Sequence, residues 1–231
     1  MRWRWRWRQV IRVAQWLAAL ALLVLVLGQI LLPRIAASRI SSRIGRYGKV
    51  ESVHVTAWPA IELLWRHADS ATVHASNLRL SPVQTAHLLW EGRGLGRIDV
   101  SASSVQEGPL QLSAVKLHKH GERLQAHALL SQSDARAALP PGFGMQLLGS
   151  ANGQVQVRAS GGLFGVGAAV DAVAQASNGK LVVQPRGFLV QALKLTLFSD
   201  PHVRVRAVGA RATGDAGGEA GYLLSIDATL R

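Results

Sequence analysis

The chain has 231 residues, 48% of them hydrophobic, and a formal net charge of +13. The excess is concentrated at one end, because residues 1–46 hold nine arginines and no acid, whereas the remainder holds 17 Lys and Arg against 13 Asp and Glu. The positive charge therefore belongs to the predicted membrane flanks rather than to a duplex-binding face, so we expect no nucleic-acid partner. The absence of cysteine excludes disulfides, a thiolate nucleophile and thiolate metal sites.

An uncharged apolar stretch, Val13–Leu32, follows a basic tail of alternating Trp and Arg at residues 1–12. As an α-helix its twenty residues span about 30 Å, the thickness of a bilayer's hydrocarbon core. We therefore predict a transmembrane anchor at residues 13–32, with a cytoplasmic tail before it. The alternative is a signal peptide cleaved near Ala36–Ser38. In the anchored form the chain is single-pass in a bacterial cytoplasmic membrane, with its main domain on the external or periplasmic side.

Residues 33–48 show the period of a juxtamembrane amphipathic helix. Ala36, Ile40 and Ile44 share one face and the arginines another, so the helix either lies on a leaflet or packs on the next domain; packing is the commoner outcome. Arginine is attracted to anionic headgroups. The predicted membrane-surface residues are Arg34, Arg39, Arg43 and Arg46.

Residues 49–231 change to a strand period and form the predicted β-rich domain. About ten strands alternate with two or three short helices, one of them opened by a capping box at Ser81–Gln84. A bulge is expected at Ser76–Asn77, and Asn178–Gly179 is the strongest hairpin signal. The predicted fold class is α+β: an N-terminal transmembrane helix followed by a β-rich, mainly antiparallel domain with a few short helices.

Catalytic signatures are absent from the sequence, which has no GxSxG, HExxH or P-loop pattern. His118 and His120 share a strand face but lack a third ligand nearby, and nothing pairs the carboxylates of Asp99, Glu107 and Asp134. The Gly92–Gly96 run precedes a strand, the reverse of a phosphate-binding loop. We predict no enzyme, metal or cofactor. A hydrolase using His118 and His120 ranks third among the hypotheses.

The apolar faces of the strands are the more informative feature. They form either an ordinary sandwich core or a surface for an acyl chain, and the predicted membrane anchor and arginine-bearing helix favour the lipid. The predicted lipid-binding residues are Leu112, Val115, Leu117, Val155, Val157, Leu181, Val183, Leu193, Leu195 and Leu197.

Residues 49–82 resemble the opening of the LmeA-like phospholipid-binding family of bacterial envelope proteins. The likeness is carried by a G-x-V-x-x-V-x-V strand from Gly48, a Pro-x-x-x-Leu-Leu segment from Pro59 and an Asp-Ser-x-x-Val strand from Asp69. It extends over roughly residues 35–190, but Trp65–His67 stands where the family pattern has glycine. The resemblance implies a tubular lipid-binding type of fold that takes phospholipid against its sheet.

The leading hypothesis is therefore a membrane-anchored envelope protein that binds phospholipid, or another acyl lipid, in an apolar concavity. Burial of an acyl chain is worth about 0.8 kcal/mol per CH₂, so no polar recognition motif is needed. Its expected partners are membrane lipids, anionic phospholipid in particular. The alternative is a non-enzymatic scaffold or assembly protein of the envelope that binds a protein partner.

Overall fold

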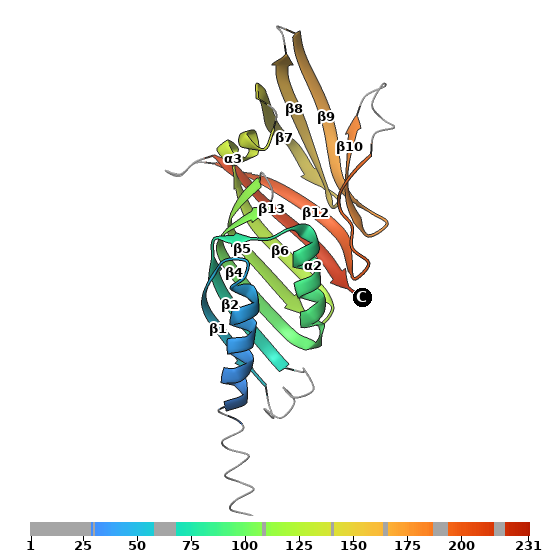
Figure 1. The fold of residues 1–231 in the computed structure, drawn as a ribbon. Coiled ribbons are helices and arrows are strands. Elements are labelled where there is room, and N and C mark those ends of the chain that lie inside the picture. Colours follow the sequence, from blue (N-terminus) through green and yellow to red (C-terminus); the bar gives the residue numbers. More distant parts are fainter. Residues whose placement is uncertain are drawn as a thin grey trace, which may run out of the picture.

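The computed structural model describes residues 29, 31–57, 68–107, 110–139, 141–163, 166–186, 194–214 and 220–231. The described strands form two sheets, A and B, which meet at β12 (Val203–Thr213) (Figure 1). The described chain is mostly β with few helices, which corrects the predicted α+β class.

Sheet A has eight strands in the order β1-β2-β4-β5-β6-β13-β12, with the short β3 beside β4. Neighbouring strands are antiparallel, except that β2 and β3 run parallel to β4. A parallel pair needs a crossover connection, and α2 (Pro82–Glu91) supplies it. The remaining bounds are β1 (Lys49–Thr56), β2 (Ala68–Ser76), β3 (Leu78–Arg79), β4 (Leu95–Glu107), β5 (Leu110–His120), β6 (Arg123–Ser131) and β13 (Gly221–Leu230).

The capping box fixes the start of α2. The Gln84 backbone N–H donates to Ser81 Oγ at 3.3 Å, and the Ser81 N–H donates to Gln84 Oε1 at 2.9 Å, so two otherwise unpaired donors are satisfied. At its other end α2 passes into the short 3₁₀ helix η2 (Gly92–Gly94), which turns the chain into β4.

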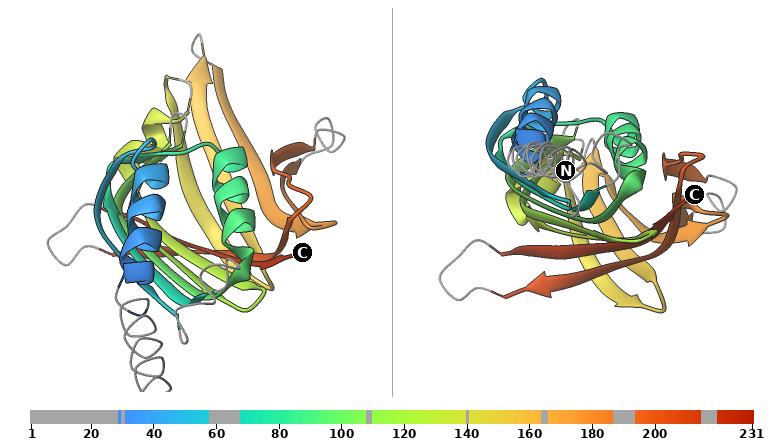
Figure 2. Two further views of the ribbon diagram at one scale, coloured as in Figure 1. Left: turned by 60° about the horizontal axis from the view of Figure 1, so that its bottom comes forward. Right: turned by 90° about the horizontal axis from the view of Figure 1, so that it is seen from below.

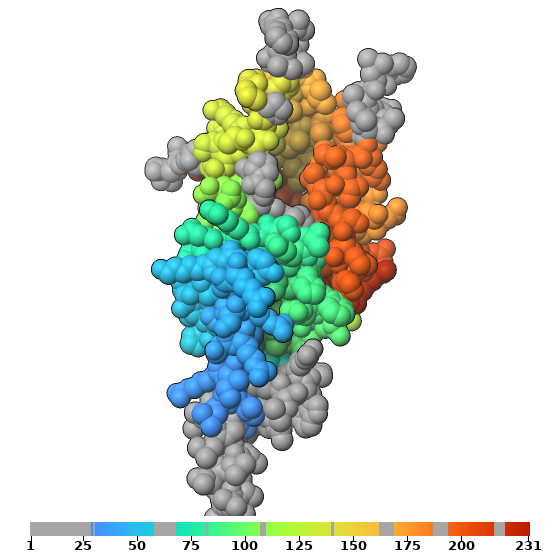
Figure 3. All heavy atoms as spheres, viewed as in Figure 1, coloured from blue at the N-terminus to red at the C-terminus, as the bar shows by residue number. Residues whose placement is uncertain are grey.

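Two helices cover one face of sheet A, called here the inner face (Figure 2). The N-terminal helix, residues 31–44, packs Ala36 and Ile40 on β1 and β2. Helix α2 packs Ala86 and Leu89 against β6, β12 and β13. The two helices adjoin on the surface in Figure 3. The apolar stripe of the amphipathic helix therefore packs on the domain, because the inner face leaves apolar side chains to be covered.

Two residues with positive φ interrupt the regular alternation of side chains in sheet A. Asn77, between β2 and β3, has φ 53°, at the position where the sequence predicts a bulge. Ala114 in β5 has φ 47°, and the β5–β6 register shifts between Ser113 and Lys116. This shift brings Leu112 into one cluster with the buried Tyr222 of β13.

Sheet B has five strands in the order β11-β10-β9-β8-β7, and α3 (Gln132–Ala137) leads into it from β6. Two of its hairpin turns dock on the edge of sheet A: the Val205 N–H donates to Gly179 O at 2.9 Å and the Val208 N–H to Gly153 O at 3.2 Å. These bonds satisfy donors that an edge strand would otherwise leave open. The bounds are β7 (Phe143–Ala151), β8 (Gln154–Leu163), β9 (Val166–Ser177), β10 (Lys180–Arg186) and β11 (Leu195–Phe198).

The predicted membrane anchor requires correction. Among the described residues no helix has both the length and the apolar character needed to cross a membrane. This finding contradicts the predicted transmembrane helix and, with it, the predicted single-pass location in a bacterial cytoplasmic membrane with a periplasmic main domain. The described helix at residues 31–44 carries Arg34, Arg39 and Arg43 and packs on a sheet. Most of Val13–Leu32 lies outside the described residues, as does the Trp/Arg tail.

Most strands of the structure lie where the sequence shows a strand period, but β7 has no predicted counterpart. Its sequence, FGMQLLGSA, follows Pro140-Pro141-Gly142 and contains two glycines. Pairing with β8 over eight registered positions forms it instead. Tertiary pairing here overrides a weak local pattern.

Candidate functional site

The apolar faces of the two sheets join into one continuous surface. On sheet A, Ile226 of β13 lies opposite Val208 of β12. Val208 packs in one cluster with Val155 and Ala174 of sheet B. The register of sheet B continues the row from Val155 through Ala174 and Val183 to Leu195. These six residues are called here the apolar surface: Ile226, Val208, Val155, Ala174, Val183 and Leu195.

The middle of the apolar surface is buried and its two ends are open. Val208 and Val155 are 7% and 8% exposed, whereas Ile226 is 37% and Leu195 62% exposed. Leu197, beyond Leu195 on the same edge strand, is 50% exposed. Large apolar side chains that share one surface and remain open to solvent are characteristic of a binding surface.

The opposite face of sheet B carries polar side chains around two buried valines, Val173 and Val182. Arg158 of β8 makes a bidentate pair with Asp171 of β9, at 2.6 and 2.9 Å. These hydrogen bonds lower the pKa of Asp171 and raise the pKa of Arg158. Beside the pair, Gln154, Gln175 and Gln184 line an open hollow of about 390 Å³. Sheet B is thus amphipathic, and its apolar face needs a cover that β12 supplies only in part.

The predicted lipid-binding residues divide among several places. Leu112, Val115 and Leu117 belong to three different clusters of sheet A. Val155, Val157 and Leu181 pack together with β12. Val183 is half-buried, while Leu195 and Leu197 are exposed. Leu193 lies outside the described residues. The structure therefore brings together the sheet B members and keeps the sheet A members as core.

The predicted membrane-surface arginines are all exposed. Arg43 has a defined partner, since its Nη1 lies 2.8 Å from Glu91 Oε2 at the end of α2. This pair links the two helices of the inner face. Arg34, Arg39 and Arg46 complete the set, and they follow the solvent side of the helix and the turn after it.

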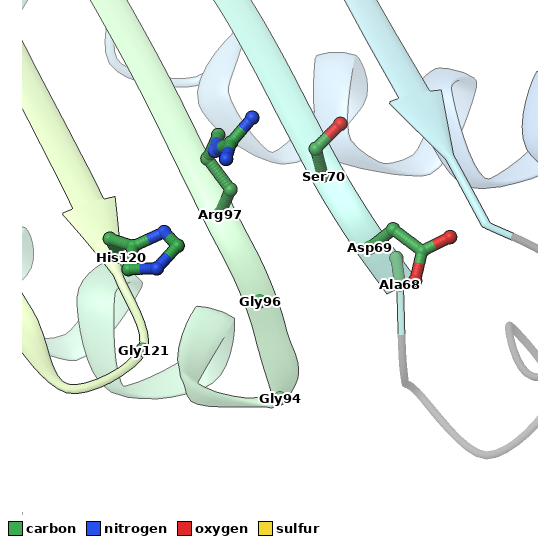
Figure 4. Close-up of a pocket in the computed structure, with 8 residues that line it drawn as sticks. All are labelled: Ala68, Asp69, Ser70, Gly94, Gly96, Arg97, His120 and Gly121. Atoms are coloured by element: carbon green, nitrogen blue, oxygen red, sulfur yellow. The ribbon is translucent and has the colours of Figure 1, made fainter.

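A second hollow, of about 650 Å³, lies where β2 and β4 begin and β5 ends (Figure 4). Ser70 lies opposite Arg97, and Arg97 lies opposite His120. In Figure 4 these side chains stand on the face of sheet A away from its helices, called here the outer face. Gly94, Gly96, Gly121, Ala68 and Asp69 complete the lining.

A buried lysine stands beside this hollow. Lys119 is 1% exposed, and its Nζ donates to Leu95 O and, at 3.3 Å, to Arg93 O. Burial lowers the pKa of the Lys119 ammonium, because desolvation disfavours the charged form. In the sequence Lys119 stands between His118 and His120. Strand alternation turns it inward when His118 and His120 face outward.

His118 and His120 lie on β5, on the outer face of sheet A. His118 Nδ1 lies 2.7 Å from Asp99 Oδ1 across β4 and β5, which orients the ring. Within the described part of the chain, no three His, Asp or Glu side chains are placed to hold a metal ion. Glu107 lies at the other end of β4 from Asp99, and Asp134 lies in α3, where Ser131 Oγ donates to Asp134 Oδ2 as part of the helix cap.

Comparison with known proteins adds no relative: no family model, curated protein or solved structure matches this chain. The resemblance of residues 49–82 to the LmeA-like family therefore stays a prediction.

Sequence reasoning missed Ile226, Val208, Arg97 and Lys119. The alternation of Leu224, Ile226 and Ala228 is a usable signal for Ile226. Nothing local marks Arg97, because its neighbour His120 is brought to it by strand pairing.

Proposed function

We propose that this protein binds an acyl-chain lipid along its apolar surface. The observation that carries the proposal is the continuous apolar row from Ile226 to Leu195, buried in the middle and open at both ends. The six residues of the row have no polar side chain, which suits a ligand recognised by burial rather than by hydrogen bonds.

The open part of the row can hold a segment of one acyl chain. From Ala174 on β9 through Val183 to Leu195 on β11 it crosses three strands, and strands lie about 4.8 Å apart, so it extends about 10 Å. Val155 and Val208, which pack against each other, close the row at its inner end.

A cation lies near the open end of the row, on the other side of the edge strand from Leu195. Lys194 precedes Leu195 in the chain, is exposed, and donates from Nζ to Ser177 Oγ at 3.0 Å on the polar face of sheet B. Because β11 is the last strand of the sheet, an anionic headgroup that extends past this edge would gain from the charge. An anionic phospholipid or a fatty acid is therefore the preferred ligand class.

The test is native mass spectrometry of the full chain after incubation with palmitate or phosphatidylglycerol. We expect a mass increase of a single lipid. Burial of a leucine is worth about 1.5–3 kcal/mol, so Leu195→Glu weakens binding about tenfold or more.

Val83→Glu is the matched control, because Val83 is 70% exposed on α2 and lies outside the apolar surface. Equal binding by Leu195→Glu and the unchanged chain would overturn the proposal. A lipid-free chain that dimerises, with the dimer lost in Leu195→Glu, would also overturn it and would favour a protein-binding scaffold.

A further inference from the structure

We propose that the hollow at the ends of β2, β4 and β5 binds a phosphoryl group, held by Arg97 and His120. The site lies on the outer face of sheet A, whereas the apolar surface continues the inner face. The two sites can therefore be tested separately, and failure of one leaves the other standing.

Three polar side chains from three strands line the hollow, and one of them, Ser70, also shares a hydrogen bond with Thr56 through Oγ at 2.6 Å. Ser70, Arg97 and His120 occupy paired positions in β2, β4 and β5, and side chains at paired positions start about 5 Å apart. A hydroxyl, a guanidinium and an imidazole in one row match the three peripheral oxygens of a phosphoryl group. Arginine in particular offers paired donors to phosphate. Figure 4 shows all three side chains on the same side of the strands.

Glycines keep the wall of the hollow bare. A Cβ on Gly96 would lie 3.0 Å from Asp69 O, so the strands approach closely there. Gly121 has φ 57° and open space around it. Bare backbone lets a ligand approach peptide groups directly.

The buried Lys119 orients part of that backbone. Its Nζ binds the carbonyls of Arg93 and Leu95, which belong to the same peptide units as the N–H groups of Gly94 and Gly96. In a trans peptide the N–H points opposite to the C=O, so the N–H of Gly96 turns away from Lys119. Gly96 lines the hollow, and a peptide dipole oriented in this way favours an anion on its N–H side. The N–H of Gly94 belongs to the 3₁₀ turn of η2.

The charges also give the ligand a direction. Arg97 and His120 lie toward one side of the hollow, and Asp69 lies toward the other (Figure 4). The phosphoryl group belongs at the Arg97 side. The volume of about 650 Å³ exceeds a bare phosphate and falls within the range of small-molecule sites.

Isothermal titration calorimetry of the full chain with glycerol 3-phosphate tests the site. Loss of a charged hydrogen-bonding partner is worth about 1.5–3 kcal/mol, so we expect Arg97→Gln to weaken binding at least about tenfold. His120→Asn is expected to weaken it less. Acetate, a planar anion with two oxygens, is expected to give no measurable heat.

Two variants serve as controls. Arg211→Gln removes an exposed arginine at the far end of β12, and His127→Asn removes a histidine on β6 at a register position away from the hollow. Both are expected to bind as the unchanged chain does. Equal binding by Arg97→Gln, binding of acetate as strong as that of glycerol 3-phosphate, or no binding of any phosphoryl probe would each overturn the proposal.

A second arm separates a soluble ligand from a lipid headgroup. Vesicles of phosphatidylcholine with and without phosphatidic acid are sedimented with the protein. A headgroup in the hollow is supported if the protein binds the phosphatidic acid vesicles, if Arg97→Gln abolishes this binding, and if Leu195→Glu leaves it intact. Binding of glycerol 3-phosphate without vesicle binding supports a soluble phosphate ester.

Discussion

Sheet A and sheet B have similar alternating sequences and very different burial. On sheet A the N-terminal helix and α2 cover the inner face, and Ala71 and Val73 are 2% and 3% exposed. On sheet B the apolar face is covered where it meets β12, Val173 and Val182 on the other face are 5% and 1% exposed, and Leu195 remains 62% exposed. An alternating strand thus shows that one face is apolar, whereas the elements packed on it decide whether that face is core or binding surface.

The largest expected effect separates the two sheets directly. Leu124 of β6 is 4% exposed and packs beneath α2, so Leu124→Ala leaves a cavity and lowers the free energy of unfolding by about 2–5 kcal/mol. The same change at Leu195 is expected to stay within about 0.5 kcal/mol. Urea denaturation measures both. Similar losses at the two positions would show that Leu195 is core.

The junction between the sheets is expected to be the next most sensitive place. Gly153 has φ 71°, and a Cβ there would lie 3.0 Å from Ala207 Cβ of β12. Gly153→Ala is expected to cost about 1–3 kcal/mol and to loosen sheet B from β12. Hydrogen exchange should then speed up in sheet B and not in the helix-covered part of sheet A.

Gly149→Ala is the control for this junction, because a Cβ on Gly149 meets no atom within 4 Å. Uniform loss of protection in both sheets after Gly153→Ala would mean that they unfold as one unit.

A smaller effect distinguishes the buried lysine of sheet A from an exposed one. Burial lowers the pKa of Lys119, so between its folded and its ordinary value the unfolded chain binds more protons. Stability contributed by this group therefore rises with pH in the alkaline range just below the ordinary lysine pKa. As the pH rises toward the ordinary lysine pKa, the free energy of unfolding of the unchanged chain should increase relative to that of Lys119→Met. A pH-independent difference would show that Lys119 titrates normally.

The smallest effect belongs to the polar face of sheet B. The pKa of Asp171 is lowered by its hydrogen bonds from Arg158, so its contribution is present above the ordinary carboxylate pKa and is lost as the pH falls through the folded value. Both side chains are solvent-accessible, and salt screens such pairs. An NMR titration should show a higher Asp171 pKa in Arg158→Gln. An unchanged pKa would mean that the pair does not persist in solution.

Local features of the fold follow well from the sequence. The capping box at Ser81 and Gln84 forms as predicted, and Asn178 and Gly179 form the turn between β9 and β10. Both depend on contacts within a few residues, which the sequence contains entirely. The transmembrane helix at residues 13–32 was predicted from length and hydropathy alone. Among the described residues the structure has no helix able to span a membrane.

The candidate sites are harder to predict from the sequence than the local features, because the pairing of distant strands assembles them. Val208 and Val155 are distant in sequence. They come into contact because β12 has a bulge and because the hairpin turns of sheet B dock on that strand. Arg97 and His120 become neighbours through the β4–β5 register. No local pattern specifies either juxtaposition.

The sequence alone determined the periodicity of this protein: which residues alternate, where turns fall, and which helix carries an apolar stripe. Only the tertiary structure decided which apolar face is covered, so that Val203 becomes core and Leu195 remains open. It also decided that Lys119 is buried against two carbonyls. The physical reason is that periodicity arises from backbone geometry over a few residues, whereas coverage and register depend on the order in which distant strands pair and dock.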